Sequence, residues 1–265
     1  MTGRVTVTIE NHVALVTLTR ADKMNALDPA MFAAIAEAGE ALRRDSNLRA
    51  VVLCGAGDNF CAGIDTNSFG DMIQNIDAIK KEMLNPPLGE IANRFQKMCY
   101  VWQEIDVPVI AALHGAVFGA GAQLALAADF RVCRPDMRLS IMESKWGLIP
   151  DMGLTQNLPK LLRADQAKDL MMTARILDGD AAFALGLVTW IDDDPLAFAQ
   201  NYATGLAARS PQSVQGSKRL IEDSWNAAAK TGLTLEARLQ ADLIASPNQV
   251  EAVMANMAKR PPVFT

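Results

Sequence analysis

The sequence predicts an α/β fold in which short buried strands alternate with helices. The clearest sign is residues 107–129, VPVIAALHGAVFGAGAQLALAAD, which open as an apolar, β-branched run, pass through glycines and continue with a helical composition. Residues 28–65 show the same alternation, and a strand–helix–strand unit of this kind has a right-handed crossover and parallel strands. Half of the 265 residues are hydrophobic and 21% are charged, as in a globular protein with a sizeable core.

The first third of the chain follows this pattern. Residues 5–9 and 13–19 alternate apolar and polar positions and predict a hairpin, with His12 in its solvated turn. Asp28 is a capping residue and Pro29 fits a first helical turn, so a helix is expected over residues 30–44. Two further strands are expected: a continuous apolar strand over residues 50–54 and a second one over residues 60–65 that runs into a glycine.

The rest of the chain is mainly helical by pattern. Residues 67–100 are polar and rich in methionine, which indicates short helices and a mobile loop over a pocket. Residues 1–195 are interpreted as the core and residues 196–265 as a helical region that covers its own core, a neighbouring subunit, or both. The expected helices cover residues 96–104, 165–173, 181–185, 196–209, 213–229, 234–245 and 248–258, with short strands at 130–133 and 186–188.

Charge and cysteine content argue against several classes of protein. The net charge is −5 and no basic block is present, which argues against nucleic acid or an anionic membrane as a partner. The first residues lack the basic start and apolar core of a signal peptide. The four cysteines have no metal-ligand spacing and the chain has two histidines, so we expect reduced cysteines, a cytoplasmic location and no metal site.

The glycines of residues 107–129 leave several interpretations open. A helix that begins in glycines presents free backbone N–H groups, which bind a phosphate or an oxygen that becomes negative during a reaction. A membrane span is a second interpretation, but Pro108, His114 and Gln123 interrupt the apolar run. Close packing alone is a third, and His114 itself is expected to be a core residue. No G-x-S-x-G or G-x-G-x-x-G motif is present, so neither a serine hydrolase nor a dinucleotide-binding protein is indicated.

Five stretches together resemble the enoyl-CoA hydratase/isomerase (crotonase) superfamily, and they follow one another in the family's order along nearly the whole chain. They are residues 20–27 (RADKMNAL), 55–65 (GAGDNFCAGID), 108–129, 143–156 (ESKWGLIPDMGLTQ) and 251–264, which end in KRPPVF. The resemblance implies a crotonase-like spiral of repeated ββα units with a helical C-terminal trimerisation region. It also implies a homotrimer or homohexamer whose partner molecule is an acyl-CoA. The CoA thioester is then the substrate, and no separate cofactor is expected.

The resemblance also implies roles for individual residues. The backbone N–H groups of Ile64 and Ala120 would polarise the thioester carbonyl, so that a proton leaves the neighbouring carbon and an enolate forms. Family members commonly have glycine at the position of Ala120, whose methyl group would narrow the acyl site. CoA contacts are expected at Ala21, Lys23, Ala26, Ala62 and Asp65, with Lys259 or Arg260 reaching CoA from the tail.

The reaction depends on three polar residues. The family's hydratases hold water between two glutamates; here one position is Gln123, whose amide cannot take up a proton, and the other is Glu143. Asp151 resembles an aspartate of the family's isomerases, although an acid there is a nucleophile in dehalogenase relatives. The prediction is an acyl-CoA double-bond isomerase, of the 3-enoyl or the dienoyl type. Its alternatives are a 2-enoyl-CoA hydratase of fatty-acid β-oxidation and a catalytically silent CoA-ester-binding protein.

Overall fold

The computed structural model describes residues 3–68 and 74–265 and confirms the α/β class. Its main sheet has the strand order β1-β2-β3-β4-β6-β8. The first pair of strands is antiparallel, as expected of the hairpin, and every later pair in this sheet is parallel. The strands are β1 (Val5–Glu10), β2 (Val13–Leu18), β3 (Ala50–Gly55), β4 (Val109–Leu113), β6 (Phe130–Cys133) and β8 (Trp190–Ile191).

Helices cover both faces of this sheet, so β3 and β4 are buried on both sides. Val51 and Leu53 of β3 lie in one core cluster with residues of α1 (Pro29–Arg43) and α4 (Arg94–Glu104). Val52 lies in the other cluster with α9 (Pro195–Ala207), whose Ala199 and Ala203 are fully buried. The boundary near residue 195 stays a prediction, and α9 itself packs on the sheet.

A second, two-stranded sheet pairs β5 (Ala116–Phe118) with β7 (Arg138–Ser140). Strands β4 and β5 are followed by α5 (Ala120–Leu126), which gives one ββα unit of the spiral. The strand expected over residues 60–65 is not formed. Cys61 and Ile64 instead make single bridges to Val117 and Leu27, because Gly63 has φ +89° and interrupts the extended backbone. The strand expected at 186–188 lies later, in β8, since Gly186 has φ +85° and ends α8 (Gly179–Leu185).

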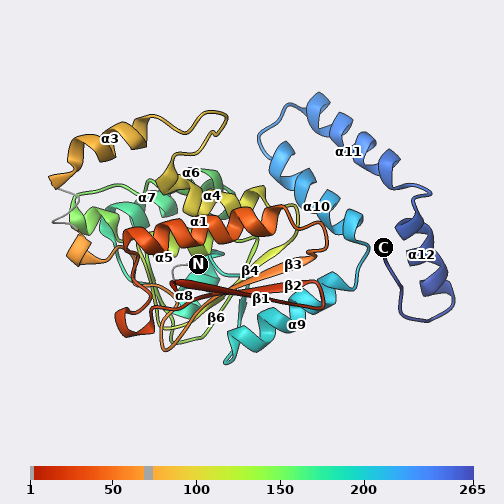
Figure 1. Ribbon diagram of the computed structural model, residues 1–265, viewed down its shortest axis with the longest axis horizontal. Coiled ribbons are helices and arrows are strands. Elements are labelled where there is room, and N and C mark those ends of the chain that lie inside the picture. Colours follow the sequence, from red (N-terminus) through yellow and green to blue (C-terminus); the bar gives the residue numbers. More distant parts are fainter. Residues whose placement is uncertain (1–2, 69–73) are drawn as a thin grey trace.

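The remaining helices lie around the spiral (Figure 1). Helix α3 (Ile76–Leu84) lies next to α4 on the outer side, and α6 (Leu154–Leu161) and α7 (Ala164–Thr173) follow the loop that carries Asp151. Helices α10 (Pro211–Ser224), α11 (Ala229–Leu243) and α12 (Pro247–Met257) extend away from the sheet to one side. In the part of the chain that the structure describes, no helix is long and apolar enough to cross a membrane.

Candidate active site

Two loops meet at the edge of the core and form the first part of the site. The N–H groups of Ala62 and Leu27 donate to the carbonyl oxygens of Met24 and Gly63, respectively. The N–H of Asp65 donates to the carbonyl oxygen of Leu27. The fully buried Asn25 holds the first loop, because its side chain accepts from Arg20 N–H and donates to the Ala56 and Asn59 carbonyl oxygens. Sequence analysis missed this role of Asn25; its residue type is the available signal, because asparagine tolerates the left-handed backbone (φ +54°) that the loop adopts here.

The two predicted backbone donors lie close together. In the parallel bridge between Leu27 and Ile64, the two hydrogen bonds of Leu27 go to the Gly63 carbonyl oxygen and come from the Asp65 N–H. The N–H of Ile64 takes no part in the bridge and points away from Leu27. A Cβ built on Gly63 would lie 3.7 Å from Ala120 N, which shows that the two glycine turns touch. Ala120 begins α5, and within residues 3–68 and 74–265 neither its N–H nor that of Ile64 has a hydrogen-bond acceptor. Both N–H groups therefore remain available to a further acceptor.

Glu143 and Gln123 form a buried pair directly beside these donors. Gln123 Nε2 donates to Glu143 Oε1 at 2.7 Å, and Gln123 Oε1 accepts from Met152 N–H at 2.9 Å. A Cβ on Gly119 would lie 3.5 Å from Glu143 Oε1, so the carboxyl group faces the turn that precedes Ala120. Glu143 is 8% exposed, and its Oε2 is buried without a hydrogen-bond partner among the described residues.

The second acid, Asp151, lies on the loop that Gln123 contacts through Met152. Burial raises the pKa of the Asp151 carboxyl group. The pKa of Glu143 is also raised, mainly by burial and further by the charge of Asp151, and the hydrogen bond from Gln123 opposes this shift. Two carboxyl groups with raised pKa values that repel each other's charge suit proton transfer near neutral pH.

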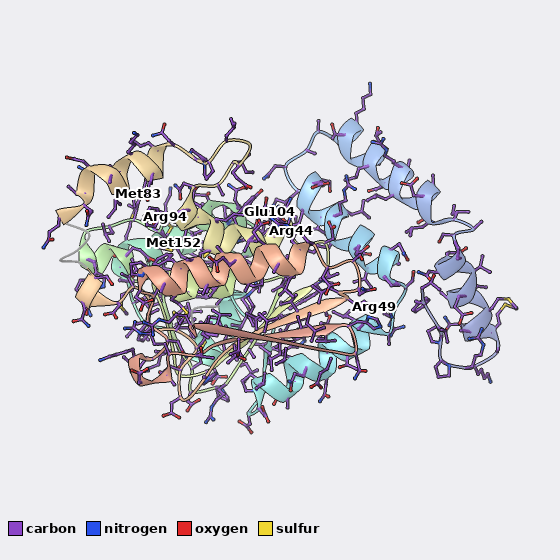
Figure 2. The ribbon with its side chains drawn as sticks, viewed as in Figure 1. Arg44, Arg49, Met83, Arg94, Glu104 and Met152 are labelled. Atoms are coloured by element: carbon purple, nitrogen blue, oxygen red, sulfur yellow. The ribbon has the colours of Figure 1, made fainter. Side chains whose placement is uncertain are left out.

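A cavity of about 790 Å³ adjoins these groups. Ile64, Asp151 and Met152 line one end of it, and α1, α3 and α4 form its walls. Leu148 and Met83 also line the cavity. Figure 2 shows Met83 and Met152 near the same end of α1. The volume and the apolar lining are typical of a site for a small organic molecule.

The residues predicted to contact CoA come together on the two loops described above. Ala21 and Lys23 lie exposed on the 3-10 helix η1 (Ala21–Lys23), and Ala26 and Ala62 are half-buried. Asp65 is buried, and its carboxylate accepts from Asn67 and forms an ion pair of 2.7 Å with Arg20 Nη2. The hydrogen bond from Asn67 N–H and the Arg20 guanidinium hold the pKa of Asp65 below its usual range. Its carboxylate therefore orders the loop, while its backbone N–H and carbonyl oxygen bond to Leu27 and Ser68.

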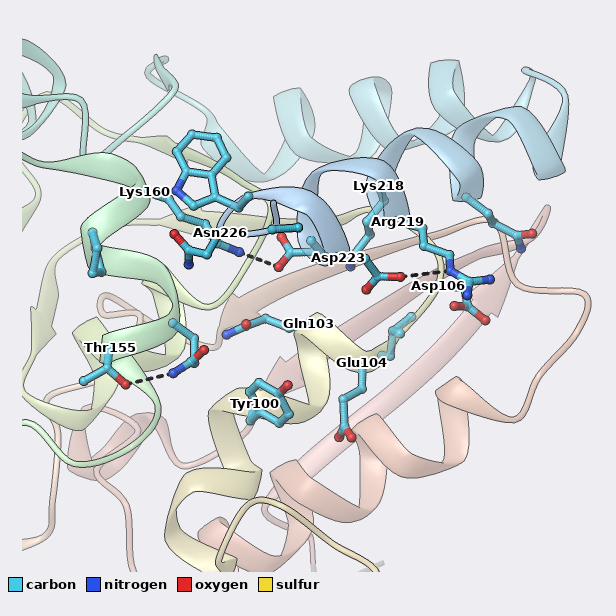
Figure 3. A pocket seen from close by; sticks show the side chains of 17 residues that line it. Tyr100, Gln103, Glu104, Asp106, Thr155, Lys160, Lys218, Arg219, Asp223 and Asn226 are labelled. Atoms are coloured by element: carbon cyan, nitrogen blue, oxygen red, sulfur yellow. Dashed lines mark hydrogen bonds and ion pairs between the residues drawn. The ribbon is translucent and has the colours of Figure 1, made fainter. Parts of the chain in front are cut away.

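A second hollow, of about 550 Å³, lies between α4, α6 and α10 (Figure 3). Four of its charged side chains form ion pairs: Lys160 with Glu222 at 2.5 Å and Arg219 with Asp223 at 3.0 Å. None of the predicted catalytic residues lines it. His114, expected in the core, is only partly buried; its Nε2 lies 2.9 Å from the Gly57 carbonyl oxygen and it borders neither hollow. The described residues contain no cluster of His, Cys, Asp and Glu side chains that could hold a metal ion.

Known proteins are similar to this chain over most of its length. The family model "Enoyl-CoA hydratase/isomerase" matches residues 8–265. The chain is 31% identical to the peroxisomal Delta(3,5)-Delta(2,4)-dienoyl-CoA isomerase of Arabidopsis thaliana, over 93% of this chain and 90% of that protein. It is 33% identical to the 1,2-epoxyphenylacetyl-CoA isomerase of Escherichia coli, over 97% and 96% of the two chains. It is also 28% identical to the mouse mitochondrial methylglutaconyl-CoA hydratase, over 95% and 79%.

Solved structures show the same fold. The enoyl-CoA hydratase of Bacillus anthracis superposes with a TM-score of 0.89 at 27% identity, over 98% of each chain. An enoyl-CoA hydratase from Polaromonas gives a TM-score of 0.88, also at 27% identity, over 98% of this chain and 99% of that one. The five sequence stretches, the spiral fold and these matches agree, and the chain belongs to the enoyl-CoA hydratase/isomerase family.

Proposed function

We propose that this protein is an acyl-CoA double-bond isomerase of the dienoyl type, which converts a 3,5-dienoyl-CoA to a 2,4-dienoyl-CoA. The single observation that carries the proposal is the pair of buried acids, Glu143 beside the two backbone donors and Asp151 in the wall of the acyl cavity. The relatives named as dienoyl-CoA isomerases support the same reaction. The thioester is the substrate, and no further cofactor takes part.

The proposed reaction moves one proton along the chain. The N–H groups of Ile64 and Ala120 bind the thioester oxygen while the Glu143 carboxylate removes a proton from C2. The electron pair of the broken C–H bond spreads through the two double bonds, and the protonated Asp151 gives its proton to C6. The double bonds then lie at C2 and C4. The two acids share one proton, and its passage from Glu143 to Asp151 restores the reactive form; burial raises the pKa of Asp151, which favours that form.

Gln123 argues against hydration as the main activity. Both polar atoms of its side chain already have partners, Glu143 and Met152, and an amide does not take up a proton near neutral pH. Water would therefore have one titratable partner at this position where the family's hydratases have two. The relatedness to a methylglutaconyl-CoA hydratase makes hydration the outcome to test against.

The decisive experiment gives the purified protein a 3,5-dienoyl-CoA, a 3-enoyl-CoA and a 2-enoyl-CoA in separate assays and follows the thioester absorbance. Conversion of the dienoyl ester, with slow loss of the 2-enoyl ester, is expected. Asp151→Asn should abolish dienoyl turnover but keep part of the 3-enoyl turnover, which needs a single base. Glu143→Gln should lower both by roughly 10²–10⁴-fold. Fast hydration of the 2-enoyl ester, or CoA-ester binding without turnover of any ester, would refute the proposal.

We also propose that the C-terminal helices pack against further copies of the chain in a homotrimer or homohexamer. Helices α10 and α11 have no buried residue in the single chain, and α12 exposes Val250, Val253, Met254 and Met257. Exposed apolar residues in such a row are typical of interfaces. Light scattering at several protein concentrations tests this, and a stable monomer would refute it. A cytoplasmic location likewise stays a prediction, because the relatives include peroxisomal and mitochondrial proteins.

A further inference from the structure

The acyl cavity extends well beyond the reacting groups, along one face of α1. Successive turns of this helix contribute to its wall, from the catalytic end outward: Phe32, Ala33, Ala36 and Glu40, followed by Arg44 directly after the helix. Residues with this spacing lie on one side of a helix. Figure 2 shows Met152 near the first turns of α1 and Arg44 at its far end. The cavity is therefore an elongated channel and not a compact chamber.

Apolar side chains from two other helices face this part of α1. Ile79 and Met83 of α3 and Phe95 of α4 line the channel. Phe95 meets Phe32 edge to face, with 6.1 Å between the ring centroids, at the end nearer the catalytic residues. Ala33 and Ala36 lie beyond this pair, and their small side chains keep the middle of the channel open. The chemistry of these walls favours a hydrocarbon.

The far end of the channel is a fixed cluster of charges. Lys97 Nζ lies 2.7 Å from Glu40, 2.9 Å from Glu90 and 2.7 Å from Glu104, and its side chain is only 12% exposed. The segment that carries Glu90 is held again where Asn93 Nδ2 donates to the Met83 carbonyl oxygen. A hydrocarbon gains little by displacing groups that satisfy one another so well. The apolar walls therefore end at the pair formed by Glu40 and Lys97.

The length of the channel follows from the helix that forms its wall. Glu40, where the apolar walls end, lies eight residues beyond Phe32, which is about 12 Å at a rise of ~1.5 Å per residue. A fully extended chain advances roughly 1.2 Å per covalent bond, so about ten bonds fit along this path. A short or compact acyl group would fill only the end nearest Asp151.

We propose that the preferred substrate is a long straight-chain acyl-CoA, and that Ala36 is the position that admits its distal half. The inference rests on the proposed isomerase function for its assay, but it concerns the channel alone. Each methylene group buried between Ala36, Ile79 and the neighbouring apolar side chains adds binding free energy until the chain reaches Glu40 and Lys97. The value of kcat/KM should therefore rise with the length of the acyl chain and then level off.

The test compares a series of 3,5-dienoyl-CoA esters from about six to eighteen carbons on the native protein and on Ala36→Phe. The larger side chain should block the channel beyond its first turns. The matched control is Ala41→Phe, which makes the same change on the exposed side of the same helix, away from the channel. Thermal unfolding of all three proteins shows whether each variant folds. Ala36→Leu replaces Ala36→Phe if the latter does not fold.

We expect kcat/KM to rise at least tenfold from six to about sixteen carbons in the native protein. Ala36→Phe should lose that gain while turning over the six-carbon ester within about twofold of the native rate, and Ala41→Phe should behave as the native protein does. A preference for short or phenylacetyl-type esters, or equal losses at all lengths in Ala36→Phe, would overturn the proposal.

Binding without turnover separates this inference from the isomerase proposal. Calorimetry with saturated hexanoyl-CoA and palmitoyl-CoA tests the channel alone, since neither ester can be isomerised. Tighter binding of palmitoyl-CoA that is lost in Ala36→Phe supports the channel even if no dienoyl ester is turned over. Equal affinity for the two esters overturns it even if the protein is an isomerase.

Discussion

The side-chain amide of Gln123 joins the two acids of the site: its Nε2 donates to Glu143 Oε1, and its Oε1 accepts from the N–H of Met152, the residue after Asp151. One oxygen of Glu143 is thereby fixed, and the other, Oε2, is buried and unpaired among the described residues. A carboxylate held in this way is a positioned base, because one oxygen sets its orientation while the other is available for a proton.

Gln123→Glu should convert part of the activity from isomerisation to hydration. A second carboxyl group in hydrogen-bond contact with Glu143 shares a proton with it, which is the arrangement that water addition requires. We expect the hydration rate of a 2-enoyl-CoA to rise at least tenfold and the isomerisation rate to fall. Gln123→Met is the control, since it keeps the volume without adding a carboxyl group. Equal hydration rates in the two variants would contradict the role given to Gln123.

Asp151→Asn should move the pH dependence of the remaining activity to lower pH. The charge of Asp151 raises the pKa of Glu143, so its removal lowers that pKa and the base is ionised at lower pH. The measurement is the pH profile of kcat/KM with a 3-enoyl-CoA, which needs only Glu143. An acid limb at the same pH in the native protein and in the variant would show that the two carboxyl groups do not interact.

Glu143→Gln should stabilise the folded protein at neutral pH while it lowers activity. Because the folded-state pKa of Glu143 is raised, the native carboxyl group binds protons more tightly than the unfolded one, so stability falls as pH rises from the usual glutamate range through the raised value. The neutral amide removes this pH-dependent loss of stability. Urea unfolding at acidic and neutral pH measures the free energy of unfolding of both proteins. The control is Glu37→Gln, an exposed change on α1. Lower stability of Glu143→Gln at neutral pH would contradict the burial argument.

Gly63→Ala should abolish turnover and destabilise the fold. Gly63 has φ +89°, and a Cβ there would lie 2.7 Å from the Phe118 carbonyl oxygen, so the turn that presents the Ile64 N–H must shift. Loss of one such donor costs about 2.7–4 kcal/mol in the transition state, or roughly 10²–10³-fold in rate. The control Gly205→Ala in α9 meets nothing within 4 Å and should raise stability slightly. Normal kcat in Gly63→Ala would remove Ile64 from the mechanism.

Asp65→Asn should weaken CoA-ester binding and remove a pH-dependent part of the stability. The lowered pKa of Asp65 means that its ion pair with Arg20 stabilises the fold above the usual aspartate range, and that this contribution is lost as pH falls through the lowered value. The loop over residues 20–27 should then be less ordered. Calorimetry with a saturated acyl-CoA measures the binding, and chemical unfolding across acidic pH measures the stability. Unchanged affinity would show that Asp65 does not order the CoA-binding surface.

Much of the fold was predictable because its signals are local. The alternation of residues 5–9 and 13–19, the Asp28 cap with Pro29, and the apolar run at 50–54 each report burial or capping within a few residues. The prediction failed at residues 60–65, where apolar composition suggested a strand. The backbone there instead pairs singly with Leu27 and Val117, and these partners lie far away in the sequence.

The sequence by itself determined the first hairpin, the helix that begins at Pro29, the strand at residues 50–54, the glycines at positions 63 and 119, and the two acids eight residues apart, since each depends on residue type and spacing. Only the tertiary structure decided that Gln123 contacts Glu143, that Asp65 is held by Arg20, and that residues of α1, α3 and α4 line one cavity. Burial and pKa shifts depend on atoms from elements distant in the chain, and no local pattern reports those neighbours.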